Sequence, residues 1–143
     1  MWYSLVVQED IRKLKMKEAL QDVLGRYLKE KGFVGRLPHF RRFRENEVHV
    51  LTIQFNTHGG SYVVEVTKFP TEFKHPSLGI IDPKKLTSGH AAWQDRKRLN
   101  PTKSEDYWFD YSSFTGNSEP FRNSAESVIP LIESQAEKLW SER

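Results

Sequence analysis

The stretch EVHVLTIQFNTHGGSYVVEVT, residues 47–67, decides the fold. Side chains alternate between a more apolar and a more polar face in two runs, 47–56 and 61–67, as expected for strands that lie on a buried core. The short connection between the runs contains two glycines, which favours an antiparallel hairpin over a helical crossover. A further run with strand composition, 40–44, precedes the hairpin. Residues 39–67 therefore predict three antiparallel strands.

Upstream of the sheet, residues 8–31 predict an amphipathic helix. Apolar side chains recur there three and four residues apart, and charged side chains fill the opposite face. Gly32 follows the last lysine of this segment, at a position where a glycine C-cap is favoured. The helix is therefore expected to end at that glycine.

The end of the chain predicts a second helix over residues 123–141. Asn123 followed by Glu126 resembles a capping box, in which the two side chains satisfy free amides of the first turn. Pro130 lies inside this segment, and it lacks an amide donor while its ring clashes with the preceding turn. We therefore expect Pro130 to kink or divide the helix.

Between the hairpin and the final helix the pattern weakens. Residues 68–103 contain four prolines and predict a long irregular insert with one short strand near 91–99. Residues 107–114 carry aromatic side chains at every second position and predict another strand. The elements together predict a two-layer α+β fold with an antiparallel sheet of about four to six strands and both helices on one face. The length predicts one domain over residues 1–143.

The composition excludes several kinds of chemistry. The chain has no cysteine, which removes disulfides, thiolate zinc sites and cysteine nucleophiles. Its first ten residues lack the basic lead and apolar stretch of a secretory leader, and no apolar run approaches the ~18 residues that a membrane span needs. These features predict a soluble, cytoplasmic protein with no membrane partner.

The formal net charge of +3 is unevenly distributed along the chain. Residues 36–44 and residues 96–103 each carry four cations and no acid, which gives +8 in two short segments. Removing those eight leaves 14 cations against 19 acids, so the remaining residues carry −5. The arrangement of charge is therefore more informative than its sum.

Catalytic and metal-binding patterns are weak. The five histidines lack the paired spacing of a metal site, and no nucleophile-elbow, phosphate-loop or dinucleotide-binding motif is present. Clustered acids are expected to pair with Arg96 or Arg98 across the sheet rather than to act in acid–base catalysis. We therefore predict no catalytic residue, metal or cofactor. The clustered acids are Glu105, Asp106 and Asp110.

Seven side chains are the candidate contacts to a ligand or partner. In a regular strand, Arg42 and Arg44 project to the same face as Phe40, which places cations beside an aromatic ring. Trp93 lies in the insert, where it either anchors a partner or packs onto the core. The complete set is Arg41, Arg42, Arg44, Trp93, Arg96, Arg98 and Trp108.

The leading interpretation is a non-enzymatic binding domain whose open sheet face or insert, 68–103, contacts a protein or a small ligand. The alternative is nucleic-acid binding through the two basic segments, because cations beside aromatic rings combine phosphate neutralisation with base stacking. The net charge is modest and no known nucleic-acid motif is present, so neutralisation of the arginines by nearby glutamates is favoured over nucleic-acid binding. A second alternative is an enzyme of unknown class that uses carboxylates with His49 or His90.

A family resemblance runs from about residue 20 to residue 140. It rests on Leu24, Leu28, Lys31-Gly32-Phe33, Phe40-Arg41-Arg42, residues 48–55, Gly60 to Val66, Arg98-Leu99, Tyr107-Trp108-Phe109, Leu131 and Trp140. With these residues the chain resembles the family called domain of unknown function 4304, although Tyr107 stands where a tryptophan is common and the segment before Arg98 is longer. The resemblance implies a small bacterial-type α+β domain, and it carries no activity, cofactor or catalytic residue.

Overall fold

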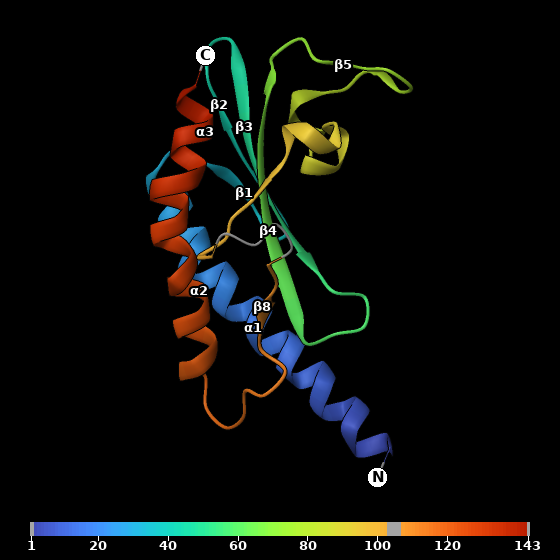
Figure 1. Cartoon of the computed structure of the whole chain (residues 1–143), viewed down its shortest axis with the longest axis vertical. Helices are drawn as coiled ribbons and strands as arrows, with labels where there is room; N and C mark the ends of the chain where they lie inside the picture. The colour runs from blue at the N-terminus through green and yellow to red at the C-terminus, as the bar shows by residue number, and fades with distance from the viewer. Residues whose placement is uncertain (1, 103–106, 143) are drawn as a thin grey trace.

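The computed structural model describes residues 2–102 and 107–142, with side chains from residue 11 onward (Figure 1). The helices are α1 (Trp2–Glu30), α2 (Glu119–Leu131) and α3 (Glu137–Ser141), and a π-helical turn, η4 (Ile132–Ala136), joins α2 to α3. The main sheet contains β1 (Val34–Arg36), β2 (His39–Phe43), β3 (Glu47–Phe55), β4 (Ser61–Pro70), β7 (Lys97–Arg98) and β8 (Phe109–Asp110). The insert contains the hairpin β5 (Lys74–His75) and β6 (Gly79–Ile80), and the 3-10 turns η1 (Pro83–Lys85), η2 (Ser88–His90) and η3 (Trp93–Asp95).

The main sheet is antiparallel, with strand order β1-β2-β3-β4-β7, and β8 also pairs with β4. Strands β3 and β4 form the central hairpin, with Ile53 opposite Val64. Gly59 and Gly60 turn between them with φ of 84° and 80°, in the left-handed region that favours glycine. The predicted α+β class and the antiparallel hairpin are confirmed.

The helices cover one face of this sheet, as predicted. Buried side chains of α1 meet those of the sheet and of the C-terminal helical segment in one apolar core. Trp140 belongs to this core, and its indole Nε1 donates a hydrogen bond to the Thr67 carbonyl at 2.9 Å. Within the described residues, no helix is both long and apolar enough to cross a membrane. The core includes Met16, Leu20, Leu24, Leu28, Phe40, Leu51, Ile53, Tyr62, Val64, Val66, Phe121, Val128, Ile132 and Trp140.

The insert covers the opposite face at one end of the sheet, where the sequence predicts an open surface. Val48 and Val50 alternate with the residues that face the helices, so β3 is apolar on both faces and needs cover on both sides. Leu86 and Ala91 from the insert bury these valines together with Phe69. Figure 1 shows the insert and the C-terminal helices on opposite sides of the sheet. The open-face expectation is therefore wrong at this end.

The C-terminal helix begins earlier than predicted. Its first residue is Glu119, whose amide donates to Asn117 Oδ1 at 3.1 Å, and Pro120 follows in the first turn, where a proline is tolerated. The capping box predicted at Asn123 is wrong, because Asn123 lies inside α2. The predicted effect of Pro130 is confirmed, since α2 ends at the next residue and a π-helical turn follows.

The other predicted boundaries also shift. Helix α1 extends back to Trp2 instead of beginning at residue 8. The strand predicted over 107–114 reduces to the two residues of β8, and the strand predicted near 91–99 reduces to β7. Both short strands lie along the same edge of β4. They extend the sheet only locally and leave room beside β7 for side chains from the insert and from the helices.

Candidate functional site

The seven predicted contact residues separate into two groups. Trp93, Arg96, Arg98 and Trp108 gather beside β7, where both arginines lie over the Trp93 ring and Arg98 also lies over the Trp108 ring. The three predicted contacts from the first basic segment, Arg41, Arg42 and Arg44, lie on or after β2, two strands away from β4. The two basic segments therefore do not form one continuous surface on the sheet.

Arg42 lies in the interior. Its side chain is 5% exposed, and its guanidinium carbon lies 4.6 Å from the Phe33 ring centroid and 5.1 Å from that of Trp140. Nη2 donates to Glu137 Oε1 at 2.5 Å, and Nε donates to His49 Nδ1 at 3.0 Å. Arg42 thus ties β2 to the last helix, and its donors are used within the protein.

The other two arginines of this segment point elsewhere. Arg41 lies on the insert side of the sheet, and its Nε donates to the Leu86 carbonyl at 2.6 Å. Burial lowers the pKa of Arg41. Arg44 follows β2 and is exposed. Because Arg42 is buried under the helices and Arg41 holds the insert, the predicted basic face formed by Arg42 and Arg44 does not exist.

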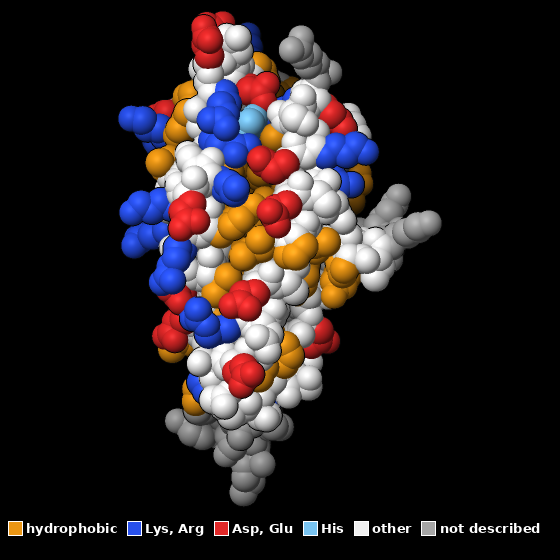
Figure 2. Space-filling view, turned by 90° about the vertical axis from the view of Figure 1, so that its left-hand side faces the viewer, with side chains coloured by type: hydrophobic (Ala, Val, Ile, Leu, Met, Phe, Trp, Pro, Cys, Tyr) orange, Lys and Arg blue, Asp and Glu red, His pale blue; other side chains and the backbone are white. Residues whose placement is uncertain are grey.

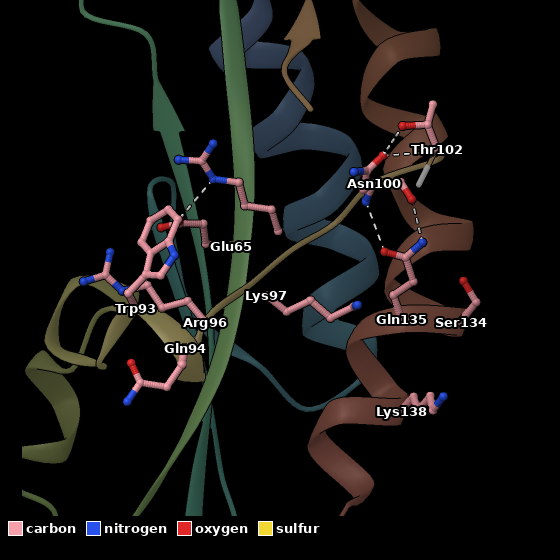
Figure 3. A pocket seen from close by; sticks show the side chains of 11 residues that line it. Glu65, Trp93, Gln94, Arg96, Lys97, Asn100, Thr102, Ser134, Gln135 and Lys138 are labelled. Carbon is pink, nitrogen blue, oxygen red and sulfur yellow. Dashed lines mark hydrogen bonds and ion pairs between the residues drawn. The ribbon is translucent and has the colours of Figure 1, made fainter. Parts of the chain in front are cut away.

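A hollow of about 800 Å³ opens between the β7 edge of the sheet and the C-terminal helical segment (Figure 3). We call it the Trp93 groove. One side comes from β4, β7 and the end of the insert, and the other side comes from η4 and α3. Its lining residues are Glu65, Trp93, Gln94, Arg96, Lys97, Arg98, Asn100, Thr102, Ser134, Gln135 and Lys138.

Arg98 is held on the groove wall by Glu65. The two residues are opposite each other in the register of β4 and β7 and so share one face of the sheet. Arg98 Nε lies 3.3 Å from Glu65 Oε2, and Ser88 Oγ donates to Glu65 Oε1 at 3.0 Å. The Glu65 side chain is only 4% exposed, so its charge is compensated inside the protein.

Two tryptophans flank this ion pair. The guanidinium carbon of Arg98 lies 5.8 Å from the Trp93 ring centroid and 5.3 Å from that of Trp108, within cation–π range of both. The prediction that Asp110 pairs with Arg96 or Arg98 is wrong. Asp110 accepts hydrogen bonds from the hydroxyl and amide of Ser112, which lower its pKa. Glu105 and Asp106 lie outside the described residues.

Trp93 projects from the insert into solvent. It is 67% exposed, so it does not close the insert onto the core. Its backbone is nonetheless well held, because Arg96 donates from Nε to the Ala91 carbonyl at 3.0 Å and from Nη2 to the Gly89 carbonyl at 3.2 Å. The Arg96 guanidinium carbon also lies 5.9 Å from the Trp93 ring centroid. A large aromatic ring therefore stands exposed on a rigid turn.

Two lysines face each other across the groove. Lys97 belongs to β7 and Lys138 to α3, and Figure 3 shows them on opposite sides of the hollow. Both are exposed, and neither has a carboxylate partner among the residues that the structure describes. Gln135 fixes the two sides together, since it accepts from the Asn100 amide at 3.0 Å and donates to the Asn100 carbonyl at 2.7 Å.

Lys138 is not among the predicted contacts, because the periodicity of the last helix marks only its apolar residues. Lys97 lies within the second predicted basic segment and is likewise not among the seven predicted contacts. Charges on the outer helical face are mixed in sign, as Figure 2 shows for the side of the molecule that carries the C-terminal helices. The groove differs from that face, since its exposed charged side chains are cations.

A second hollow of about 1030 Å³ adjoins the Trp93 groove. It shares Trp93, Gln94, Arg96 and Lys97 with the first hollow, so the two hollows adjoin at these residues. Its other cations are Lys68 and Lys74, and its acids are Asp95 and Glu142.

Neither histidine named for an enzyme lines the Trp93 groove, although His90 lines the adjoining hollow, and both have partners within the protein. His49 is buried, stacks on Trp140 with ring centroids 5.5 Å apart, and contacts Arg42 and Glu47 through its two ring nitrogens. His90 accepts from the Thr87 amide at 3.0 Å. Within residues 2–102 and 107–142, no three histidine, aspartate or glutamate side chains converge to hold a metal ion.

Fold and groove together define an α+β protein with an antiparallel sheet, helices on one sheet face and a positively charged groove at the β7 edge. The family model described as Domain of unknown function (DUF4304) matches residues 24–142. The chain belongs to this family, which confirms the resemblance drawn from the sequence. Comparison with curated proteins and with solved structures gives no match.

Proposed function

We propose that this chain is a non-enzymatic binding domain, and that the Trp93 groove takes a ligand carrying negative charge and a flat ring. The observation that carries the proposal is the exposed Trp93 ring, which is held on a rigid turn among cations. Its exposed fraction of 67% leaves a large apolar surface in water that a ligand ring would cover.

The charge of the groove favours an anion. Arg96, Lys97, Arg98 and Lys138 contribute four cations to its lining. Among the described residues that line the groove, Glu65 is the one acid, and it is nearly buried and paired with Arg98. A concave surface lined by one sign of charge concentrates the field and attracts ions of the opposite sign.

The groove is also preorganised. Arg96 holds the turn that carries Trp93 through two carbonyl groups, and Gln135 joins the strand side to the helix side through two further hydrogen bonds. Side chains that are already ordered lose little conformational freedom when a ligand binds. These contacts support binding without rearrangement of the backbone.

Other expectations from the sequence stay proposals. We propose that residues 1–143 form one domain and that the protein is of a bacterial type. We also propose a cytoplasmic location, because a chain without cysteine needs no oxidising compartment. A protein partner anchored by Trp93 remains the second candidate, because exposed, rigidly held tryptophans are frequent anchors of protein interfaces. The enzyme alternative, with carboxylates and His49 or His90, is a third candidate, and both of these histidines hydrogen-bond within the protein.

Tryptophan fluorescence tests the proposed function, with adenosine triphosphate as a probe that joins a flat ring to several negative charges. We expect quenching that saturates, and loss of that quenching in Trp93→Phe and in the double variant Lys97→Gln/Lys138→Gln. The matched control is Lys29→Gln/Arg36→Gln, which removes the same charge from α1 and β1. Absence of saturable quenching, or equal loss in the control, would contradict the proposal.

A further inference from the structure

We infer that the ligand of the Trp93 groove is single-stranded nucleic acid, an inference that rests on the proposed function and names its ligand. The observation behind it is that two adjoining hollows share Trp93 and that cations line both of them. Each of these features by itself fits a small anion, whereas their combination fits a chain of repeating phosphates and flat rings.

The combined extent of the two hollows favours a polymer. The Trp93 groove of about 800 Å³ and the adjoining hollow of about 1030 Å³ share Trp93, Gln94, Arg96 and Lys97. Pockets for drug-sized ligands are typically about 300 to 1,000 Å³, so one small ligand would occupy only part of this space. A chain that passes Trp93 would use both halves.

The cations follow the same course. Lys138 lines the Trp93 groove, Arg96 and Lys97 line both hollows, and Lys68 and Lys74 line the adjoining hollow. Asp95 and Glu142 also line that adjoining hollow, so the positive excess is greatest in the Trp93 groove itself. Cations spaced along a groove match phosphates that recur along a backbone, as in proteins that bind single strands.

The exposed ring favours a single strand over a duplex. Bases in a duplex are stacked on one another, so their faces are unavailable to a protein side chain, whereas the bases of a single strand can stack on an aromatic ring. Trp93 stands at the junction of the two hollows and is two-thirds exposed. An acidic peptide would satisfy the lysines and leave this ring without a regular partner.

Fluorescence anisotropy with a fluorescein-labelled oligothymidylate of about 20 nucleotides tests the inference. If the four groove cations each meet one phosphate, the dissociation constant should rise about 50-fold between about 50 and 200 mM salt. Lys97→Gln/Lys138→Gln should reduce that salt effect to about 7-fold, because two phosphate contacts are lost. Lys29→Gln/Arg36→Gln should leave it unchanged. Trp93→Ala should weaken binding at least about 5-fold, while Ile80→Ala, which shortens another exposed apolar side chain of the insert, should not.

The remaining outcomes separate this inference from the proposed function. If adenosine triphosphate binds but the oligothymidylate binds no more tightly, the inference is overturned and the proposed function stands. Equal or tighter binding of a duplex of the same length, or of poly-glutamate, overturns the inference in favour of duplex or of an acidic protein segment. If neither nucleotide nor oligonucleotide binds, both proposals fail. Folding of each variant is checked by circular dichroism before titration.

Discussion

Replacing Glu65 by glutamine tests the contact that holds one wall of the Trp93 groove. Glu65 is nearly buried on β4, and its two carboxylate oxygens meet Ser88 of the insert and Arg98 of β7. Glutamine keeps the shape of the side chain and removes its charge. The substitution therefore reports the electrostatic part of a contact that joins three segments.

The magnitude follows from burial and geometry. Removing one partner of a buried ion pair costs about 3–5 kcal/mol, and a hydrogen bond to a charged group is worth about 1.5–3 kcal/mol. The Arg98 side chain is 19% exposed and its Nε lies 3.3 Å from the carboxylate, so water and a long contact both weaken the pair. We expect Glu65→Gln to lower the free energy of unfolding by about 2 kcal/mol.

Urea unfolding followed by circular dichroism measures this loss, in a double-mutant cycle with Arg98→Gln. We expect a coupling energy of about 1–2 kcal/mol between Glu65 and Arg98. Glu72→Gln is the matched control, because Glu72 is exposed in the insert, and it should change stability by less than about 0.5 kcal/mol. A Glu65→Gln variant as stable as this control, or a coupling energy near zero, would refute the assignment.

Three further outcomes follow from the same contacts. Arg42→Ala should lower the free energy of unfolding, measured by urea titration, by about 3 kcal/mol, because it removes a buried guanidinium that contacts Glu137 and His49. The control Arg44→Ala changes an exposed residue and should have little effect. Burial is the main cause that lowers the pKa of His49, so the unfolded state binds more protons than the folded state below about pH 6.5 and stability should fall on acidification. The variant His49→Gln should show a weaker dependence of stability on pH. A stability that rises as the pH falls would contradict this assignment. Trp93→Ala should change the melting temperature by no more than a surface substitution, and a large drop would show that Trp93 supports the core.

Local sequence patterns predict the sheet and the helices well. Alternation along residues 47–67 carries the information needed for the central hairpin, because each strand buries a regular set of side chains. Pro130 divides the last helix because it has no amide N–H to donate and its ring clashes with the preceding turn, which are properties of the residue itself. Helix α2 starts before the predicted position, because Asn117, which precedes the helix, accepts the Glu119 amide and Pro120 stands in the first turn.

Long-range contacts explain the rest. Arg42 carries a charge that predicts exposure, and its burial depends on Trp140 and Glu137, which come from the far end of the chain. The groove likewise joins Lys138 of the last helix to Arg98 of a two-residue strand. The sequence pattern selected Trp93 and Arg98 as candidates, but their proximity follows only from the folded insert.

Amide-correlation NMR of nitrogen-labelled protein, titrated with adenosine triphosphate, tests the central claim that the Trp93 groove binds an anion. We predict that the largest shifts occur at the indole of Trp93, at the backbone of Lys97 and Arg98, and around Lys138. Shifts centred on Arg36 and Arg44, or no shifts at millimolar nucleotide, would contradict the claim that this groove is the binding site.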